Sequence, residues 1–451
     1  MSSTNAPTPG AAPTADPAST STEGAAGAPP RGRILAWGLW DWGSASFNAV
    51  VTTFVFTVYL TSGSFGPTGV VDAQLGWALA AAGLVVALLA PVIGQRSDTS
   101  GRRKFWLAIN TFVVVACTLG LFFVRPEPGF LLLGLVLLAV GNVFFEFGSV
   151  NYNAMLTQVS TPSTIGKVSG FGWGMGYVGG IVLLLIVYFG LIQPEVGLFG
   201  VTGADGLDVR VTMLVAAAWF AVFALPVLFA VPEFRAPGGQ RRERVGFLAS
   251  YARLGRDIAR LWREQRNVLW FLLASAVFRD GLAGVFTFGG VLAGSVYGFS
   301  AGEVIMFAIA ANLVAGVSTI AVGALDDRVG AKPVIVTALV GLVISASLIF
   351  VLHDAGKLVF WIAGLALCLF VGPAQSASRT FLGRLIPPGR EGEIFGLYAT
   401  TGRAVSFLAP TAFALFISIG GAPQFGILGI VLVLALGLAL FIPVKSTPAN
   451  R

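Results

Sequence analysis

The sequence is poor in charge, since Asp, Glu, Lys and Arg make up only 11% of its 451 residues. A soluble domain carries about 25% charged residues. So little charge cannot solvate a chain that is 56% hydrophobic, so its apolar surface must face lipid. The net charge of +7 could suggest nucleic acid. The basic residues lie in short loops between apolar runs, however, which is a membrane-topology pattern and argues against a nucleic-acid partner.

Cysteine and histidine are almost missing. Cys117 and Cys368 both fall inside apolar runs, and the single histidine, His353, lies in a short loop. Two such cysteines make no disulfide framework, and a zinc site would need three or four ligands. We therefore expect neither a metal nor a cofactor.

The sequence also lacks the motifs of several enzyme classes. It has no Gly-x-x-x-x-Gly-Lys-Ser/Thr phosphate-binding loop, which argues against ATP hydrolysis as an internal energy source. With one histidine it offers no Ser-His-Asp set in any obvious context. We therefore do not expect an enzyme.

Long apolar runs, by contrast, are abundant. Twelve segments are each long enough to cross a bilayer of about 30 Å as a helix. They predict an all-α membrane protein with twelve transmembrane helices in two six-helix halves. The expected spans are 34–62, 73–95, 104–124, 130–156, 168–192, 211–231, 268–296, 302–325, 333–352, 358–382, 394–418 and 424–444.

The runs divide the chain into five parts. Residues 1–30 are rich in Ala, Pro, Ser, Thr and Gly and are expected to be a disordered tail. Two six-helix bundles are expected at 31–231 and 268–444, with a short tail at 445–451. The linker at 232–267 becomes periodic, and its apolar positions predict an amphipathic helix on the membrane surface. That helix either tethers two bundles that rock against each other or is a solvated linker. Its apolar positions are Phe247, Tyr251, Leu254, Ile258 and Leu261.

Basic residues are distributed unevenly among the loops. Of the 28 Lys and Arg residues, only Arg125, Arg210 and Lys357 fall in the loops of one side, and Arg279 and Arg403 fall within spans. The rest gather in the loops of the other side. Because basic loops stay in the cytoplasm, this predicts a multi-pass protein of the cytoplasmic membrane with both termini cytoplasmic.

A short charged stretch recurs in each half. It reads GQRSDTSGRR at 94–103 and GALDDRVGAK at 323–332, with the same spacing of glycines and aspartate. A basic, Gly-punctuated turn at equivalent places between spans indicates two homologous bundles, which is the layout of a secondary transporter.

This repeated turn is a candidate conformational latch. Its glycines allow a sharp reversal between helices, and its aspartate can sit at a helix N-terminus across the bundle interface. Its basic residues can pair with that aspartate or bind anionic lipid. The alternative is plain topology, with basic residues in an inner loop. The latch residues would be Gly94, Asp98, Gly101, Arg102, Arg103, Gly323, Asp327, Arg328, Gly330 and Lys332.

Ionisable residues inside the spans are the next signal, because charge in a membrane marks a pathway or an ion pair. Glu146 and Asp280 lie mid-span and suit proton coupling, with a structural ion pair or a hydrogen-bonded neutral acid as the alternatives for Glu146. Arg279 and Asp280 are adjacent and point about 100° apart, so they need different partners. Arg403 could clamp a substrate carboxylate or pair with Asp41 or another acid. Asp41, near the inner interface, favours a structural role.

Polar residues in or near the ends of the spans complete this set. Asn151, Asn153 and Gln375 could bond between helices or line a cavity. The candidate substrate or proton pathway is therefore Asp41, Glu146, Asn151, Asn153, Arg279, Asp280, Gln375, Arg379 and Arg403.

Small and aromatic residues suggest packing roles. Glycines at a spacing of four, 172, 176 and 180, let a neighbouring helix approach closely. Trp37, Trp40 and Trp42 are expected in an interfacial belt rather than as a stacking platform for substrate.

The repeated turn resembles the loop signature of the major facilitator superfamily, Gly-x-x-x-Asp-Arg-x-Gly-Arg-Arg. The first copy has Thr99 where an arginine is usual, and the second has Ala331-Lys332 in place of the last arginine pair. One latch would then be weaker than the other.

More specific stretches resemble the vacuole-effluxer-like branch of that superfamily, from about residue 33 to 444. They are WGLWDWGSASF at 37–47, NYNA at 151–154, VSGFGWGMGYVGG at 168–180, GPAQSASR at 372–379, RLIPPGRE at 384–391, FGLY at 395–398 and GRAVSFLAP at 402–410. Trp40 stands where the branch usually has tyrosine, which removes a hydroxyl. The resemblance implies twelve helices and export of small metabolites, including amino acids.

The sequence thus predicts a secondary active transporter that moves a small solute by alternating access. Proton-coupled export of amino acids or similar solutes is the leading hypothesis, with facilitated diffusion left open. Multidrug efflux is one alternative, and a membrane enzyme or receptor is another. The expected partners are a small-molecule solute, protons and membrane lipid, and the expected functional unit is a monomer.

Overall fold

The computed structural model describes residues 29–233, 247–387 and 389–446, which form helices and loops without a strand. Twelve helices in these ranges are long and apolar enough to cross a membrane, as predicted. The tail expected at 1–30 lies almost entirely outside the described residues. So do the Pro- and Gly-rich start of the linker and most of 445–451.

Each half contributes six spans, joined by one further helix, α8 (Phe247–Glu264). The first half contains α1 (Arg31–Ala45), a π-helical continuation at Ser46–Phe54, α2 (Phe56–Leu60), α3 (Thr68–Ser100), α4 (Arg103–Gly120), α5 (Leu131–Ala154), α6 (Ile165–Val187) and α7 (Leu207–Ala230). The second contains α9 (Arg266–Ser295), α10 (Ala301–Val329), α11 (Ala331–Val351), α12 (Lys357–Leu385), α13 (Glu391–Val405), α14 (Leu408–Gly420) and α15 (Gly426–Phe441). Helices α1 and α2 form one span together, and so do α13 and α14.

Short 3₁₀ and π turns lie between or at the ends of these helices. They are Leu121–Phe123, Pro128–Phe130, Met155–Gln158, Tyr188–Ile192, Leu198–Gly200, Ala204–Gly206, His353–Ala355 and Pro423–Phe425.

Local chemistry determines where several helices begin and end. Ser300 and Glu303 form a capping box at the start of α10, in which each side chain accepts a hydrogen bond from the other residue's backbone N–H. Gly101 ends α3 with φ at 64°, and Gly330 follows α10 with φ at 89°. Positive φ costs little at glycine, so these two residues permit the sharp reversals into α4 and α11.

The repeated charged stretches are mostly helical, and the prediction of a turn over each whole stretch is wrong. Helix α3 continues to Ser100 and α10 to Val329, so only the last residues of each stretch leave the helix. The hydroxyls of Thr99 and Ser100 donate to the carbonyls of Arg96 and Ser97 three residues earlier. Polar side chains here bond to helix carbonyls instead of breaking the helix.

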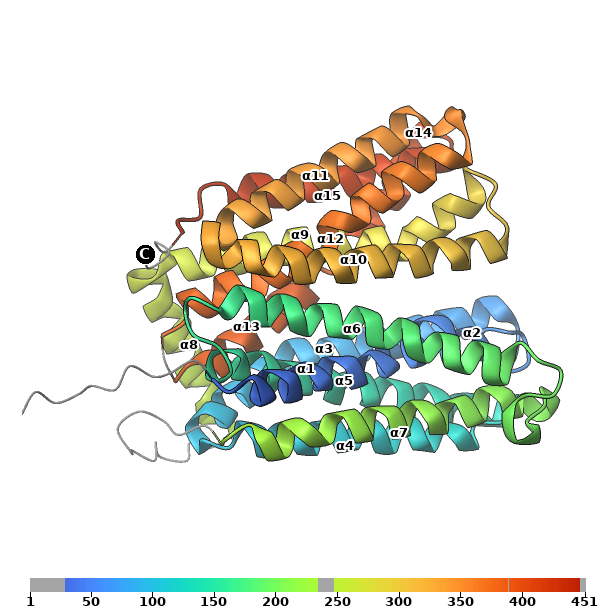
Figure 1. Ribbon diagram of the computed structural model, residues 1–451, viewed down its shortest axis with the longest axis horizontal. Coiled ribbons are helices and arrows are strands. Elements are labelled where there is room, and N and C mark those ends of the chain that lie inside the picture. Colours follow the sequence, from blue (N-terminus) through green and yellow to red (C-terminus); the bar gives the residue numbers. More distant parts are fainter. Residues whose placement is uncertain (1–28, 234–246, 388, 447–451) are drawn as a thin grey trace, which may run out of the picture.

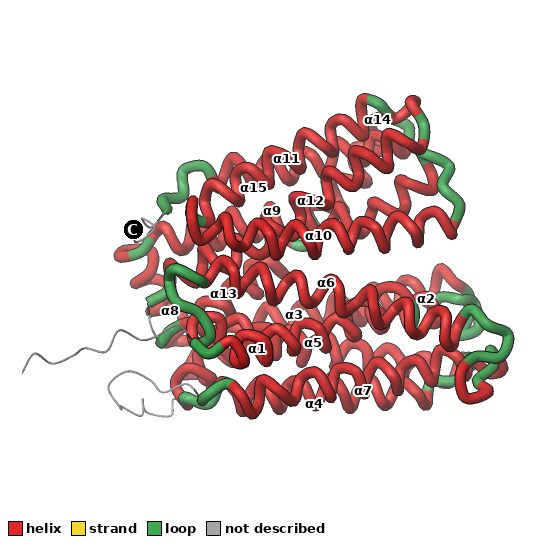
Figure 2. Tube along the Cα trace, viewed as in Figure 1, coloured by secondary structure: helices red, strands yellow, loops and turns green. Residues whose placement is uncertain are grey.

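The halves lie side by side, with α1–α7 in one and α9–α15 in the other (Figure 1). One hydrophobic core lies wholly within the first half. The other is centred on the second half and extends to residues of α3 and α5. The long loops lie at the two ends of the molecule (Figure 2).

Both described ends of the chain lie at the same end of the molecule as α8, and we call it the termini end. Asn267 Nδ2 donates to Lys445 O there at 2.6 Å, which ties α9 to the last described residues. Helix α8 contacts the first half through Tyr251, whose OH donates to Leu88 O at 3.0 Å, and the second half through Leu261, which is buried in its core. The predicted linker helix therefore spans both halves.

Large apolar side chains cover the exterior. Phe229 is 82% exposed, Trp77 77% and Ile419 75%. Such exposure on long apolar helices fits contact with the acyl chains of lipid and does not fit contact with water.

The halves touch mainly through two helix pairs, α6 with α10 and α3 with α13. Helices α6 and α10 lie together near the termini end and diverge toward the opposite end (Figure 1). The closest approaches involve glycine: a Cβ on Gly94 would lie 1.9 Å from Gly392 O, and one on Gly323 would lie 2.7 Å from Gly166 O. Gly94 and Gly323 thus lie within helices and allow the backbones of the two halves to meet. The chain reverses direction at Gly101 and Gly330 instead.

Candidate substrate cavity

A polar cavity of about 370 Å³ lies between the halves. Its walls come from α1, α5 and α6 on one side and from α9, α12 and α13 on the other. All predicted pathway residues except Asn151 line it: Asp41, Glu146, Asn153, Arg279, Asp280, Gln375, Arg379 and Arg403.

Asn151 lies outside the cavity lining. It is fully buried, and its Nδ2 donates to Phe147 O one turn earlier at 2.8 Å. Residues two apart on a helix point about 200° apart. Asn153 therefore reaches the cavity while Asn151 faces the interior of its own half.

Charges in the cavity are divided between the halves. The second half supplies the three guanidinium groups, Arg279, Arg379 and Arg403, together with the carboxylate of Asp280, whereas the first half supplies the two carboxylates of Asp41 and Glu146. Each of the two carboxylates pairs with an arginine across the cavity.

Arg403 forms an ion pair with Glu146, and its Nη2 also lies 3.5 Å from Asn142 Oδ1. The sequence left open whether Arg403 clamps a substrate carboxylate or pairs with Asp41 or another acid. In this conformation it pairs with another acid, Glu146, and not with Asp41. The two side chains are 32% and 25% exposed, so the pair can be reached from the cavity.

Asp41 pairs with Arg379, with Oδ2 lying 3.6 Å from Arg379 Nη1. The hydroxyl of Tyr152 donates to the same carboxylate oxygen at 2.9 Å. Asp41 is thus held by one group from its own half and one from the other.

Arg279 and Asp280 turn to different partners, as their adjacent positions require. Arg279 Nη1 donates to Tyr398 O at 3.1 Å, and the guanidinium lies 3.7 Å from the centre of the Tyr398 ring. Asp280 Oδ2 accepts from Ala409 N at 2.6 Å. That N–H belongs to the first turn of α14, just after the span breaks at residues 406–407, so Asp280 supplies a cap to the broken helix.

Gln375 also connects the halves, since its Oε1 accepts from Tyr177 OH at 3.0 Å.

The tryptophans of α1 are a correction to the sequence-based expectation. Trp37 and Trp40 are 0% and 2% exposed and stack on opposite sides of the Tyr152 ring, each at 4.4 Å. They are core residues instead of an interfacial belt, because α1 packs on α6 and α7 inside its half.

The glycines of α6 serve packing on two faces. Gly172, Gly176 and Gly180 lie against Trp37, Asp41 and Ala45 of α1. Gly170 and Gly174, offset by two residues, lie against Thr319 and Ile320 of α10 in the other half. Helix α6 can therefore approach both its own bundle and the opposite one closely.

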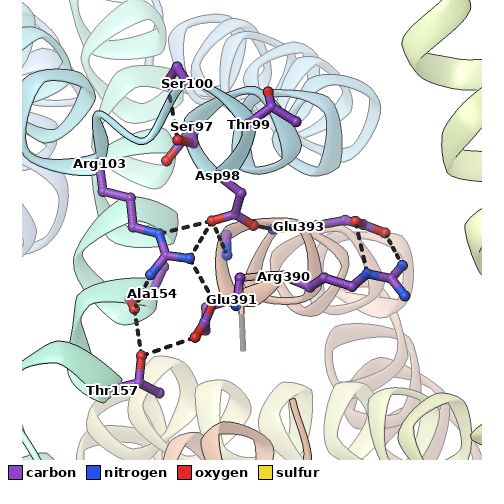
Figure 3. Close-up of polar contacts among 12 residues, drawn as sticks. Ser97, Asp98, Thr99, Ser100, Arg103, Ala154, Thr157, Arg390, Glu391 and Glu393 are labelled. Carbon is purple, nitrogen blue, oxygen red and sulfur yellow. Dashed lines mark hydrogen bonds and ion pairs between the residues drawn. The ribbon is translucent and has the colours of Figure 1, made fainter. Parts of the chain in front are cut away.

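Asp98 lies at the N-terminus of α13 in the other half. Its two carboxylate oxygens accept from Gly392 N at 3.0 Å and from Glu393 N at 2.9 Å (Figure 3). Buried Arg103 donates to Asp98 at 2.9 and 2.6 Å and reaches across to Glu391 Oε2 at 2.6 Å. A carboxylate at this position is favoured by the helix dipole and its free N–H groups.

Asp327 has the same relation to α6 in the first half. Its oxygens accept from Gly166 N at 2.7 Å and from Lys167 N at 2.9 Å. The arginine at this second contact is Arg384 of α12, which lies 2.5 Å from Asp326 and 3.1 Å from Asp327. The arginine pair missing from the second motif is thus replaced by a residue from another helix.

The other basic motif residues do different things. Lys332 Nζ donates at 2.7 Å to the carbonyls of Ile442 and Val444, so it holds the end of α15 within its own half. Arg102 and Arg328 are exposed at the termini end. Their places suit lipid or solvent more than the interface between the halves.

Sequence reasoning missed several groups that complete the site: Tyr152, Ser169, Trp173, Arg384, Glu391 and Tyr398. Each stands inside a stretch that resembles the family, but none is an ionisable residue within an apolar span. Ser169, Trp173 and Glu391 meet arginines of the opposite half, whereas Tyr152, Arg384 and Tyr398 meet charged residues of their own half, so each contact depends on how the helices pack.

The chain matches the family model described as "Vacuole effluxer Atg22 like" over residues 157–451. It is 26% identical to the uncharacterised MFS-type transporter YxiO of Bacillus subtilis over 420 residues, which cover 91% of this chain and 95% of the relative. It is 28% identical to autophagy-related protein 22 of Cryptococcus neoformans over 60% of this chain. The match spans only about half, 51%, of that relative's length.

Two solved structures share the fold. The proton:xylose symporter XylE gives a TM-score of 0.73 at 14% identity, with 93% of this chain and 96% of that chain covered. A bacterial homologue of the iron transporter ferroportin in an outward-facing state gives 0.65 at 15% identity, with 91% and 98% covered. The chain is thus a multi-pass membrane transporter of the major facilitator type rather than an enzyme, and it belongs to the vacuole effluxer Atg22-like family.

Proposed function

We propose that this transporter exports a small zwitterionic solute of the amino-acid class. The observation that carries the proposal is the division of charge in the cavity, with Asp41 and Glu146 on one half and the arginines on the other. An α-ammonium group fits the carboxylate side, and an α-carboxylate fits the guanidinium side. A bound zwitterion would therefore bridge the two halves.

The ion pairs across the cavity give a reason for coupling between substrate and conformation. Without solute, Glu146 pairs with Arg403 and Asp41 with Arg379. A zwitterion offers both charges and can replace such a pair without leaving a charge unpaired in the membrane. Binding energy is then available to shift the halves between conformations.

Protons are the proposed driving ion, and Glu146 is the proposed carrier. Protonation of Glu146 removes the negative charge that would hold the substrate ammonium group, so a proton that arrives from outside releases the solute there, as proton-driven export requires. Both side chains are partly exposed to the cavity, so a proton can reach them in this conformation.

We assign the rocking units to residues 31–231 and 268–444 and the tether to residues 232–267. By the distribution of basic loops, the termini end is cytoplasmic and the membrane is the plasma membrane. The contacts of Asp98 and Asp327 close that end, so the described conformation faces outward. These aspartates act as a latch that releases when the cavity opens to the cytoplasm, and the transporter works as a monomer surrounded by lipid.

Counterflow in liposomes tests the substrate class. Purified protein is reconstituted, loaded with one unlabelled amino acid after another, and assayed for uptake of the labelled form. Saturable exchange of at least one zwitterion, lost in Arg403→Ala, is expected. No exchange across a broad amino-acid panel, together with exchange of lipophilic cations, would reject the proposal in favour of multidrug efflux.

A further inference from the structure

Arg379 belongs to α12 of the second half, yet among the described residues its guanidinium bonds to polar groups of the first half. Nε donates to Ser169 Oγ at 3.0 Å and Nη2 to Ser169 O at 2.7 Å. Nη1 donates to Asn153 Oδ1 at 3.1 Å and lies 3.6 Å from Asp41 Oδ2. With its side chain only 4% exposed, Arg379 is inserted into the opposite half.

Three aromatic rings of the first half surround the same guanidinium. Its Cζ lies 5.0 Å from the ring centre of Trp37, 5.7 Å from that of Tyr152 and 5.6 Å from that of Trp173. Because Trp37 and Tyr152 stack on each other at 4.4 Å, the guanidinium lies beside the edges of these two rings, and Trp173 is the ring that can offer it a face. We call Asp41, Trp37, Tyr152 and Trp173 the cation box.

The box is built without help from the second half. Trp37 and Tyr152 stack at 4.4 Å with their planes 7° apart, and Trp37 Nε1 donates to Tyr152 O at 3.2 Å. Tyr152 OH donates to Asp41. The Trp173 ring, the edges of the Trp37–Tyr152 stack and the Asp41 carboxylate form a binding site for an organic cation, and the oxygens of Asn153 and Ser169 accept its N–H groups.

We infer that the cation box is a substrate subsite for an ammonium or guanidinium group, and that Arg379 occupies it as a built-in stand-in while the termini end is closed. The box is in place before any solute binds, and it holds a cation that arrives from the other half. A substrate cation of similar size and charge meets the same partners once Arg379 has left.

The position of the box shows when that exchange takes place. Ser169 lies in the first turns of α6, whose N-terminus Asp327 caps, and it also bonds to Ser376 of α12 at 2.9 and 3.0 Å. Parting of the halves at the termini end therefore withdraws Arg379 from the box. The next step rests on the proposed transport function. When Arg379 returns to the cation box, it displaces the substrate cation, and the affinity of the transporter for that cation falls on the side opposite the termini end.

Binding of guanidinium chloride to purified Arg379→Ala tests the subsite without any transport. Saturable quenching of tryptophan fluorescence and a rise in Tm are expected at millimolar guanidinium, with sodium chloride as the ionic control. Wild-type protein should show neither change, because Arg379 fills the box. Adding Trp173→Leu to Arg379→Ala should weaken binding about tenfold, the size of one desolvated cation–ring contact.

Arg403→Ala is the matched control. It also removes a cavity arginine paired with a carboxylate, but Arg403 lies over no aromatic ring among the described residues, so guanidinium should bind to that variant more weakly. Equal binding to both variants, or binding to Arg379→Ala that ignores Trp173→Leu, would overturn the inference. Absence of amino-acid exchange by the wild-type protein, with guanidinium binding to Arg379→Ala intact, would reject the proposed function and leave the subsite standing.

A variant with an unpaired buried Asp41 could fail to fold. Arg379→Ala with Asp41→Asn removes both charges and keeps the rings, and tetramethylammonium is then the probe because it carries no hydrogen-bond donor and relies on its contact with the Trp173 ring. Binding that disappears with Trp173→Leu supports the box, and the lack of any binding by this double variant contradicts it.

Discussion

Asp98 and Asp327 stand in the same relation to opposite halves: each carboxylate accepts two backbone N–H groups from the first turn of a helix in the other half. The capped helices, α13 and α6, each contribute to the fifth span of a half. The repeated motif is thus used twice around one pseudo-symmetric interface, and both copies contact the opposite half at the termini end.

Asp98→Asn should open the termini end more often. The neutral amide loses the charge that favours a helix N-terminus, at a cost of roughly 1–2 kcal/mol, so the open population should rise about 5- to 30-fold. Spin labels at Ser163→Cys and Val329→Cys, with Cys117 and Cys368 replaced by serine, report the distance between the halves. An unchanged distance distribution would show that Asp98 is not part of a latch.

Gly94→Ala should prevent closure by sterics alone. The new Cβ would lie 1.9 Å from Gly392 O, a backbone atom that cannot move without parting the helices. The same spin labels should report the longer distance in nearly all molecules. Gly76→Ala, in the same helix with no atom within 4 Å of its new Cβ, is the control and should leave the distance unchanged.

Glu146→Gln should abolish pH-driven transport and leave counterflow exchange intact. The amide cannot carry a proton but can still accept a hydrogen bond from Arg403. Accumulation driven by a pH gradient in liposomes is expected to fall by at least about tenfold, while exchange of solute stays close to wild type. Glu303→Gln, outside the cavity, is the control, and gradient-driven transport that survives in Glu146→Gln would make that residue structural.

The pair of Glu303 and Lys357 predicts a pH-dependent stability. Hydrogen bonds from Lys357 and from the backbone of Ser300 lower the pKa of Glu303 from 4.5 to about 2. A lowered folded-state pKa gives stability that is present above pH 4.5 and is lost as pH falls toward 2. The difference in Tm between wild type and Glu303→Gln should be constant near neutral pH and shrink below pH 4.5. A difference that does not depend on pH would contradict this assignment.

The sequence predicted the spans and most of the cavity because a charged side chain within an apolar span must face the protein interior or a polar cavity. Glu146, Asp280 and Arg403 therefore could be chosen as cavity residues without a structure. Their partners could not, since pairing depends on how each helix is rotated about its axis. Arg403 thus meets Glu146, while Asp41 meets Arg379.

Other features depend on packing that a single sequence does not display. Trp37 and Trp40 have the composition of an interfacial belt, yet α1 buries them against Tyr152. The extension of α3 through the charged stretch also escaped prediction, because Gly94 reads as a turn residue until the backbone of α13 is placed against it.

Transport of charge-deleted analogues tests the central claim most directly. For an amino acid that the protein exchanges in liposomes, its N-acetyl form lacks the ammonium charge and its methyl ester lacks the carboxylate. If the solute bridges oppositely charged halves, the parent amino acid is transported and both analogues are lost as substrates and as competitors. Transport of either analogue at the rate of the parent would contradict a site built from the carboxylates of one half and the arginines of the other.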